Sequence, residues 1–153
     1  KIDGEPAKMV DSSVFGSGRL DERTNSYCPV NTGLVNIAAQ VEDENFKIDG
    51  EPISILELVV KVRNFNNSSM KVEVELYDEY GKVSGVIFKK STEEPKQLRN
   101  FRYIDNGYVH CFGQLKRFYN TTTFVISMIR NVDKYSEVTC HRAKVMWDCL
   151  FRR

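Results

Sequence analysis

Three short segments of the sequence place an aromatic ring beside Lys or Arg side chains, and they are the parts best suited to binding chemistry. The residues concerned are Phe88, Lys89, Lys90, Lys116, Arg117, Phe118, Arg63 and Phe65. Aromatic rings stack on nucleobases and basic side chains neutralise phosphates, so this combination is typical of surfaces that bind single-stranded nucleic acid. A second interpretation stays open, in which the rings belong to the core and the cations line a solvated rim.

Few residues fit a catalytic role. The chain has two histidines and contains no Walker loop, no Gly-x-Ser-x-Gly and no His-Glu-x-x-His. Asp78 and Glu79 are adjacent carboxylates, but they fall in a predicted hairpin turn, where acidic residues are ordinary. We therefore expect a binding protein and not an enzyme.

The four cysteines form no recognisable metal-binding pattern. There is no Cys-x-x-Cys pair, and the pairs His110–Cys111 and Cys140–His141 are weak evidence for zinc. Buried thiols that act as small apolar groups explain these cysteines more simply, in a reducing intracellular location. The sequence indicates no cofactor.

The overall charge limits how the chain can bind a polyanion. Its 153 residues carry 22 basic and 21 acidic side chains, for a net charge of +1. A nucleic-acid surface must then be a local basic patch of modest affinity. No apolar run reaches the roughly 18–20 residues that span a bilayer, and the first residues lack the apolar stretch of a signal peptide, so we expect no membrane contact.

The N-terminal part is predicted to hold little regular structure. Residues 1–27 lack sustained apolar periodicity and read as a flexible tail. Residues 28–39 are predicted to form a short helix, with Pro29 at its start and Leu34, Ile37 and Ala38 on one face. Residues 46–48 are predicted to be extended, before a turn over residues 49–52. The hexapeptide Lys-Ile-Asp-Gly-Glu-Pro occurs at both 1–6 and 47–52.

From residue 53 the apolar period changes from that of a helix to that of strands. A long β-branched run at 53–65 predicts a strand with both faces partly buried, and Met70, Val72, Val74 and Leu76 alternate with polar residues in a second strand. The remaining predicted strands are 83–89, 108–118 and 124–130, with a polar connection over 91–106 and a turn at 120–122. Five strands of this size and order predict an all-β domain with helices, built as a Greek-key OB-fold barrel.

The chain ends in a predicted helix at 134–151 with a wide apolar arc. Val138, Arg142, Val145 and Cys149 fall on one stripe, and Met146 lies beside it. An arc of this width exceeds what one barrel can cover, which favours a contact with another chain. The alternative is a helix that only plugs its own barrel.

Four segments in order resemble the OB domain of the replication protein A middle subunit, over residues 28–151. The segments are Cys28-Pro29-Val30 with Leu34, Phe46 to Ile53, Gly113 to Phe118, and Glu137 to His141 followed by Val145-Met146. Phe46-Lys47-Ile48 is similar to the family's Phe-x-Ile, and the third segment to its Gly-x-Leu-Arg-x-Phe. No single segment is a strong motif, and the match rests on their order and spacing.

The resemblance implies a heterotrimer that binds single-stranded DNA in the nucleus. The final helix would join one helix each from a large multi-OB subunit and a small OB subunit. The implied interface residues are Val138, His141, Arg142, Val145, Met146, Cys149 and Leu150. The family's stacking aromatics correspond to Phe88 and Phe118, although the family usually has Trp at the first of these positions.

Several functions remain open from the sequence. The telomeric CST complex has a middle subunit of the same architecture, and paralogous trimers serve telomeres or telomerase, where the DNA is G-rich. A protein-interaction scaffold without DNA contact and a free-standing OB domain are further alternatives.

Overall fold

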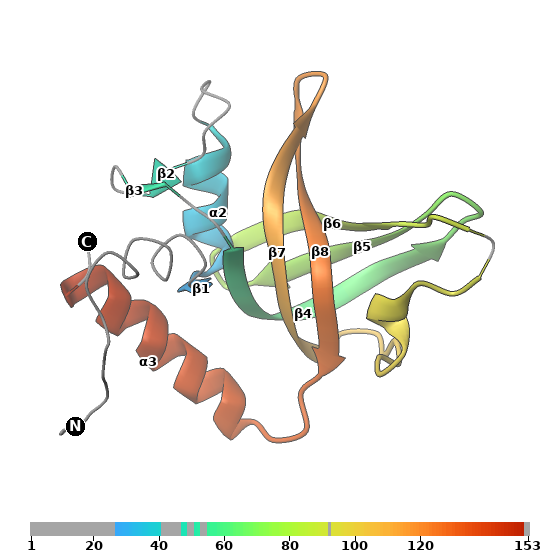
Figure 1. The fold of residues 1–153 in the computed structure, drawn as a ribbon. Coiled ribbons are helices and arrows are strands. Elements are labelled where there is room, and N and C mark those ends of the chain that lie inside the picture. Colours follow the sequence, from blue (N-terminus) through green and yellow to red (C-terminus); the bar gives the residue numbers. More distant parts are fainter. Residues whose placement is uncertain (1–26, 41–46, 49–50, 53–54, 92, 152–153) are drawn as a thin grey trace, which may run out of the picture.

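The computed structural model has a closed five-stranded barrel, as the sequence predicts (Figure 1). It describes residues 27–40, 47–48, 51–52, 55–91 and 93–151. The barrel strands are β4 (Ile55–Asn67), β5 (Lys71–Asp78), β6 (Gly81–Phe88), β7 (Tyr108–Phe118) and β8 (Thr121–Asn131). Their order is β4-β5-β6-β8-β7, and β7 pairs with β4 to close the barrel. All of these pairings are antiparallel except β6–β8, which is the connectivity of an OB-fold.

The length of β4 allows the barrel to close. Its first half, Leu56 to Lys61, pairs with β7, and its second half, from Lys61 onward, pairs with β5. A register shift between Arg63 and Asn66 bends the strand where it leaves the barrel. The expected burial of β4 on both faces is confirmed, because Leu56 to Val60 are all buried.

The alternation predicted for β5 is confirmed within the strand, but the prediction that Met70 begins it is wrong. Val72, Val74 and Leu76 are buried in the core, and the residues between them face outward. Met70 lies before the strand and is 76% exposed, because the chain is still in the β4–β5 turn at that point. The core of the barrel is filled by aliphatic side chains around Phe124.

The predicted helix at 28–39 starts four residues later than expected. Tyr27–Pro29 form β1, a short strand parallel to β4, and α2 spans Thr32–Ala39. Asn31 begins the helix, since its side-chain oxygen accepts a hydrogen bond from the Leu34 backbone N–H at 2.9 Å. The buried face of the helix consists of Thr32, Val35 and Ala38, whereas Ile37, predicted on the face of Ala38, is exposed.

The segments before β4 are only partly described. Lys47–Ile48 (β2) and Glu51–Pro52 (β3) pair as an antiparallel two-stranded sheet. The predictions for residues 1–26, Phe46, the turn residues 49–50 and Ile53 fall outside the described residues. Tyr27, predicted as the last residue of the tail, is the first residue of β1.

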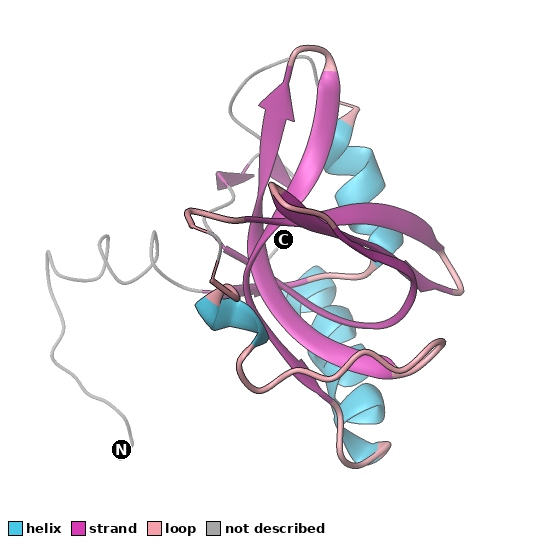
Figure 2. Ribbon diagram, turned by 90° about the vertical axis from the view of Figure 1, so that its right-hand side faces the viewer, coloured by secondary structure: helices cyan, strands magenta, loops and turns pink. Residues whose placement is uncertain are grey.

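The second half of the chain follows the predicted order with shifted boundaries. The 91–106 connection contains one 3-10 turn, η1 (Lys96–Leu98), and β7 has the predicted bounds. The hairpin turn is at Tyr119-Asn120 and not at 120–122, because Phe118 pairs directly with Thr121. The final helix, α3, spans Ser136–Phe151. Figures 1 and 2 show α2 and α3 on the same side of the barrel, with the β7–β8 hairpin rising beyond it.

Candidate nucleic-acid and partner interfaces

The two aromatic rings predicted to stack on bases meet each other in the structure. Phe88 ends β6 and Phe118 ends β7, and their ring centroids are 5.6 Å apart in an edge-to-face arrangement. The rings are 45% and 42% exposed, so neither belongs to the core. The interpretation that both are core residues is therefore wrong, whereas their binding to DNA stays a prediction. The pair forms a partly exposed aromatic surface that a base can contact.

The four cations beside these rings differ in what they contact. Lys90 and Lys116 are exposed and make no ion pair within the part of the chain that the structure describes. The ammonium of Lys89 donates a hydrogen bond to the Asn67 side-chain oxygen. Arg117 donates to the Ala39 carbonyl at 3.4 Å, which directs it toward the end of α2. Lys90 and Lys116 are thus the cations most available to phosphates.

Arg63 and Phe65, predicted to extend the patch, both have contacts within the chain. Arg63 forms an ion pair with Glu75 on β5, and its guanidinium lies 4.2 Å from the Tyr77 ring centroid. Phe65 stacks on Tyr103 at 4.9 Å and packs against the core. Their part in nucleic-acid binding remains a prediction that would require these contacts to be shared or broken.

The inner face of α3 is packed on its own barrel. Val138, His141, Val145 and Asp148 are buried. The Nε2–H of His141 donates to the Val30 carbonyl at 2.8 Å, just after β1. Burial lowers the pKa of His141 from its usual value, because it penalises the charged form of the ring. The buried residues of α3 therefore include His141 and Asp148, whereas Arg142 and Cys149, which share a stripe with Val138 and Val145, are exposed.

This packing divides the residues predicted for the subunit interface into two groups. Val138, His141 and Val145 are buried within the chain and line the groove beside α3, and their part in an interface stays a prediction. Arg142, Met146, Cys149 and Leu150 are exposed, and for them the interface stays a prediction. Sequence reasoning left Trp147 and Phe151 out of the interface; their rings lie 4.2 Å apart on the outside of α3.

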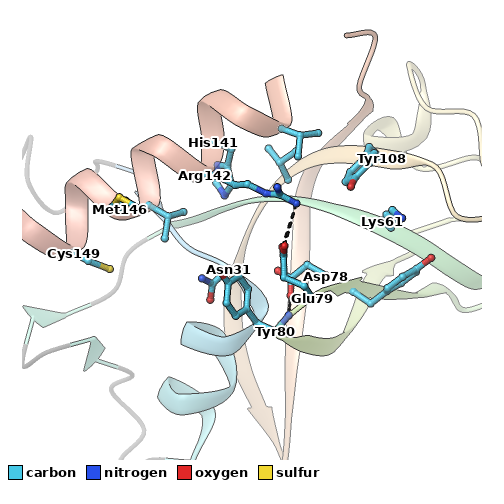
Figure 3. A pocket seen from close by; sticks show the side chains of 14 residues that line it. Asn31, Lys61, Asp78, Glu79, Tyr80, Tyr108, His141, Arg142, Met146 and Cys149 are labelled. Carbon is cyan, nitrogen blue, oxygen red and sulfur yellow. Dashed lines mark hydrogen bonds and ion pairs between the residues drawn. The ribbon is translucent and has the colours of Figure 1, made fainter. Parts of the chain in front are cut away.

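A groove of about 720 Å³ separates α3 from the β5–β6 hairpin (Figure 3). Met146 and Cys149 line it from the helix, and Tyr80 and Tyr108 line it from the barrel. The Arg142–Glu79 ion pair crosses it, with an N–O distance of 3.2 Å. The groove gives the exposed apolar face of α3 a concave border that a partner side chain can fill.

A network of charged side chains fixes α3 to three strands. The buried carboxylate of Glu57 on β4 accepts hydrogen bonds from His110 Nε2 at 2.6 Å and from Lys144 Nζ at 3.0 Å. Arg130 donates to His110 Nδ1 at 3.0 Å and pairs with Glu137. Because the Arg130 guanidinium can only donate, Nδ1 of His110 must accept and carries no proton. Because the Glu57 carboxylate accepts, Nε2 carries the proton, so the ring is neutral. Burial raises the pKa of Glu57, but the hydrogen bonds from His110 and Lys144 and the charge of Lys144 outweigh it and lower that pKa to about 2.

The adjacent carboxylates Asp78 and Glu79 have structural partners. Asp78 accepts hydrogen bonds from the Thr32 backbone N–H at 3.0 Å and from the Tyr80 N–H at 2.8 Å, which joins α2 to the hairpin. Glu79 is paired with Arg142. Among the described residues, His, Cys, Asp and Glu form no group that could hold a metal ion. No helix in the described part of the chain has the length and apolar character needed to cross a bilayer.

No family model matches the sequence. The chain is 22% identical to a 32 kDa subunit of replication protein A from Arabidopsis thaliana over 143 residues, which cover 93% of this chain and 51% of the relative. The chain thus spans about half the length of the curated relative it matches.

Three solved structures share the fold over most of the chain. A chain of a replication protein A heterotrimer bound to single-stranded DNA is 26% identical, with a TM-score of 0.68, and the match covers 82% of this chain and 97% of that one. A chain of yeast replication protein A bound to single-stranded DNA is 23% identical, with a TM-score of 0.64 and coverage of 82% and 91%. A chain of the S. pombe Stn1–Ten1 complex is 14% identical, with a TM-score of 0.67 and coverage of 80% and 90%. The identities differ more than the TM-scores do.

Proposed function

From its likeness to the middle subunit of replication protein A, we propose that this OB-fold chain is the middle subunit of a heterotrimer that binds single-stranded DNA. Residues 28–153 form its OB domain, in which α3 holds the partners and the barrel offers a DNA surface of modest affinity. The partners are a large multi-OB subunit and a small OB subunit, and the complex acts in the nucleus in DNA replication and repair. The role is binding, not catalysis.

The exposed side of α3 carries this proposal. Met146 and Trp147 are each 65% exposed, and Leu150 and Phe151 are each 68% exposed. Leaving four large apolar side chains in water on one helix is unfavourable by about 25 cal/mol for each Å² of apolar area. None of the described residues covers this face, so contact with another chain would supply this energy. Helices from two partner subunits fit an exposed helical face of this kind.

Charge substitutions on this face test the assembly. We expect Met146→Glu and Leu150→Glu, in the tagged full chain, to abolish recovery of both partner OB subunits from the native cell. The side chains are exposed in the chain alone, so its own fold should not change. Ile37→Glu is the matched control, since Ile37 is a 65% exposed apolar residue on α2. Mass spectrometry of the recovered proteins reads the result; capture of both subunits by Leu150→Glu would contradict the proposal.

Point substitutions are preferable to removal of the helix. A chain that ends at Asn131 would lose Val138 and Val145, which are buried against the barrel. Loss of partners could then follow from unfolding alone. Far-ultraviolet circular dichroism of the glutamate variants separates the two explanations.

A second candidate is a CST-type or telomerase-associated middle subunit. It is favoured by the TM-score of 0.67 with the Stn1–Ten1 chain, which matches the value for replication protein A to within 0.01. The same recovery experiment decides between them, because the sequence of the co-purifying large subunit differs. Tighter binding of G-rich than of oligothymidine strands by the purified complex would favour the telomeric role.

A further inference from the structure

Tyr119 is the most exposed large apolar or aromatic residue of the described chain. Its side chain is 98% exposed at the tip of the β7–β8 hairpin, directly after Phe118. A tyrosine ring in this position gains no packing energy from the fold. The fold therefore gives no reason for an aromatic residue here.

The backbone at this position also disfavours tyrosine. Tyr119 and Asn120 form a two-residue turn, and Tyr119 has a φ of +51°, in the left-handed region. Hairpin turns of two residues favour glycine or asparagine where φ is positive. The other two residues of the described chain, glycine aside, with positive φ are Asn64 and Asn106. A side chain that costs about 1–2 kcal/mol of backbone strain and packs against nothing is explained by a role outside the fold.

The charge of the hairpin indicates what this ring meets. Residues 108–131 contain no Asp or Glu, although the chain has 21 acidic residues in all. Lys116 is exposed on the same strand, two residues before Phe118. A hairpin without carboxylates suits the approach of a phosphate backbone.

We propose that Tyr119 is an additional base-stacking residue, which extends the single-stranded DNA surface past Phe118 by one nucleotide. This rests on the proposed DNA-binding function and adds to it the length of strand that the chain contacts. Stacking on an aromatic ring tolerates any base, so the added contact increases affinity without adding sequence preference.

Binding to oligothymidines of increasing length tests the proposal, with the full chain and the subunits that co-purify with it. We expect Tyr119→Gly to weaken binding at least about fivefold, but only for strands long enough to reach the hairpin tip. Tyr119→Phe retains the ring and should bind as the unmodified chain does. Ile104→Gly is the control, since Ile104 is an exposed apolar residue before the opposite end of β7. Equal affinity of Tyr119→Gly and the unmodified chain at every length would overturn the proposal.

Two further readouts distinguish the possible failures. Photocrosslinking of a strand with 5-iodouracil at successive positions should attach adjacent nucleotides to Phe118 and Tyr119; attachment to Phe118 alone leaves the DNA function standing and overturns the role of Tyr119. If the unmodified complex attaches no strand to this chain, both proposals are wrong. The midpoint of thermal unfolding should not be lower for Tyr119→Gly than for the unmodified chain, because glycine fits the left-handed backbone. A lowered midpoint would instead assign Tyr119 a structural role.

Discussion

The two candidate surfaces, around α3 and at the β7–β8 hairpin, differ in whether their charged side chains are paired. Around α3, the charged side chains near the exposed apolar residues are paired with each other: Glu57 with Lys144, and Glu79 with Arg142. At the β7–β8 hairpin, Lys116 has no acidic partner among the described residues, and the hairpin itself has none to offer. Both surfaces expose large apolar side chains.

This difference indicates what each surface binds. A surface for a protein partner loses water over its apolar area, so charges within it are stable only when they are already paired. A surface for a polyanion keeps its cations free, because the ligand supplies the opposite charge and displaces counterions. The pairing of charges thus separates two surfaces that hydrophobicity alone would place in one class.

The largest expected effect distinguishes the two faces of α3. Val138→Glu should lower the free energy of unfolding by about 3 kcal/mol or more, because it buries an unpaired charge. Val138 is 3% exposed and packs on the barrel. Met146→Glu, on the outer face, should change it by less than about 0.5 kcal/mol. Urea denaturation of both variants measures the difference, and similar losses would mean that α3 has no free face.

The residues that fix α3 to the barrel predict how the stability of the fold depends on pH. The pKa of Glu57 is lowered from 4.5 to about 2 in the folded chain, so its stabilising effect is complete above pH 4.5 and is lost as the pH falls toward 2. His141, whose pKa is lowered from 6.5 by burial, loses stability in the same direction, since acid protonates it in the unfolded chain first. Stability should therefore fall from about pH 6.5 downward, most steeply below pH 4.5.

The variant Glu57→Gln measures how much the Glu57 carboxylate contributes to the pH dependence of stability. It should cost about 2 kcal/mol at neutral pH, less than for a fully buried pair because Lys144 can turn to water. The gap between its stability and that of the unmodified chain should narrow as the pH falls below 4.5 and close only near pH 2, where the carboxylate of the folded chain becomes protonated. Unfolding measured between pH 2 and pH 7 for the two chains checks this. Parallel curves would show that Glu57 is not the titrating group.

The strands of the barrel could be predicted because their patterns are local. Alternation in β5 and the β-branched run of β4 reflect burial on one face and on two, and both survive in the structure. The start of α2 was missed because the sequence favours Pro29 as the first residue of a helix, while pairing with β4 holds it extended. That pairing joins residues 28 positions apart and leaves no local signal.

The inner face of α3 could not be predicted from apolar spacing. Two of its four buried residues, His141 and Asp148, are polar, and the Val30 carbonyl that His141 contacts is 111 residues away. The rings at positions 88 and 118 were found from their neighbouring cations, but their mutual contact depends on the barrel. Tyr119 was missed because the turn was predicted one residue too late, although the exposure of a turn aromatic is a usable signal.

A smaller effect is expected at the aromatic pair. Phe88→Ala and Phe118→Ala should each weaken binding of oligothymidine about fivefold. The double variant should lose less than the product, because each ring already contacts the other at 5.6 Å. The dependence of affinity on salt should not change, since no charge is removed. Unchanged affinity in all three variants would favour a protein scaffold without DNA contact.

The smallest effect, and the sharpest test of the charge criterion, is expected at Arg63. Its guanidinium is paired with Glu75 and lies over Tyr77, so it is not free to release counterions from a phosphate. Arg63→Ala should leave DNA affinity and its salt dependence unchanged, and should cost less than about 1 kcal/mol of stability as a half-exposed ion pair. Lys116→Ala, which removes a cation that pairs with no described carboxylate, should reduce the salt slope by about 1. Equal slopes for the two variants would mean that pairing within the chain does not predict which cations the DNA uses. The separation of the two surfaces by charge would then lose its basis.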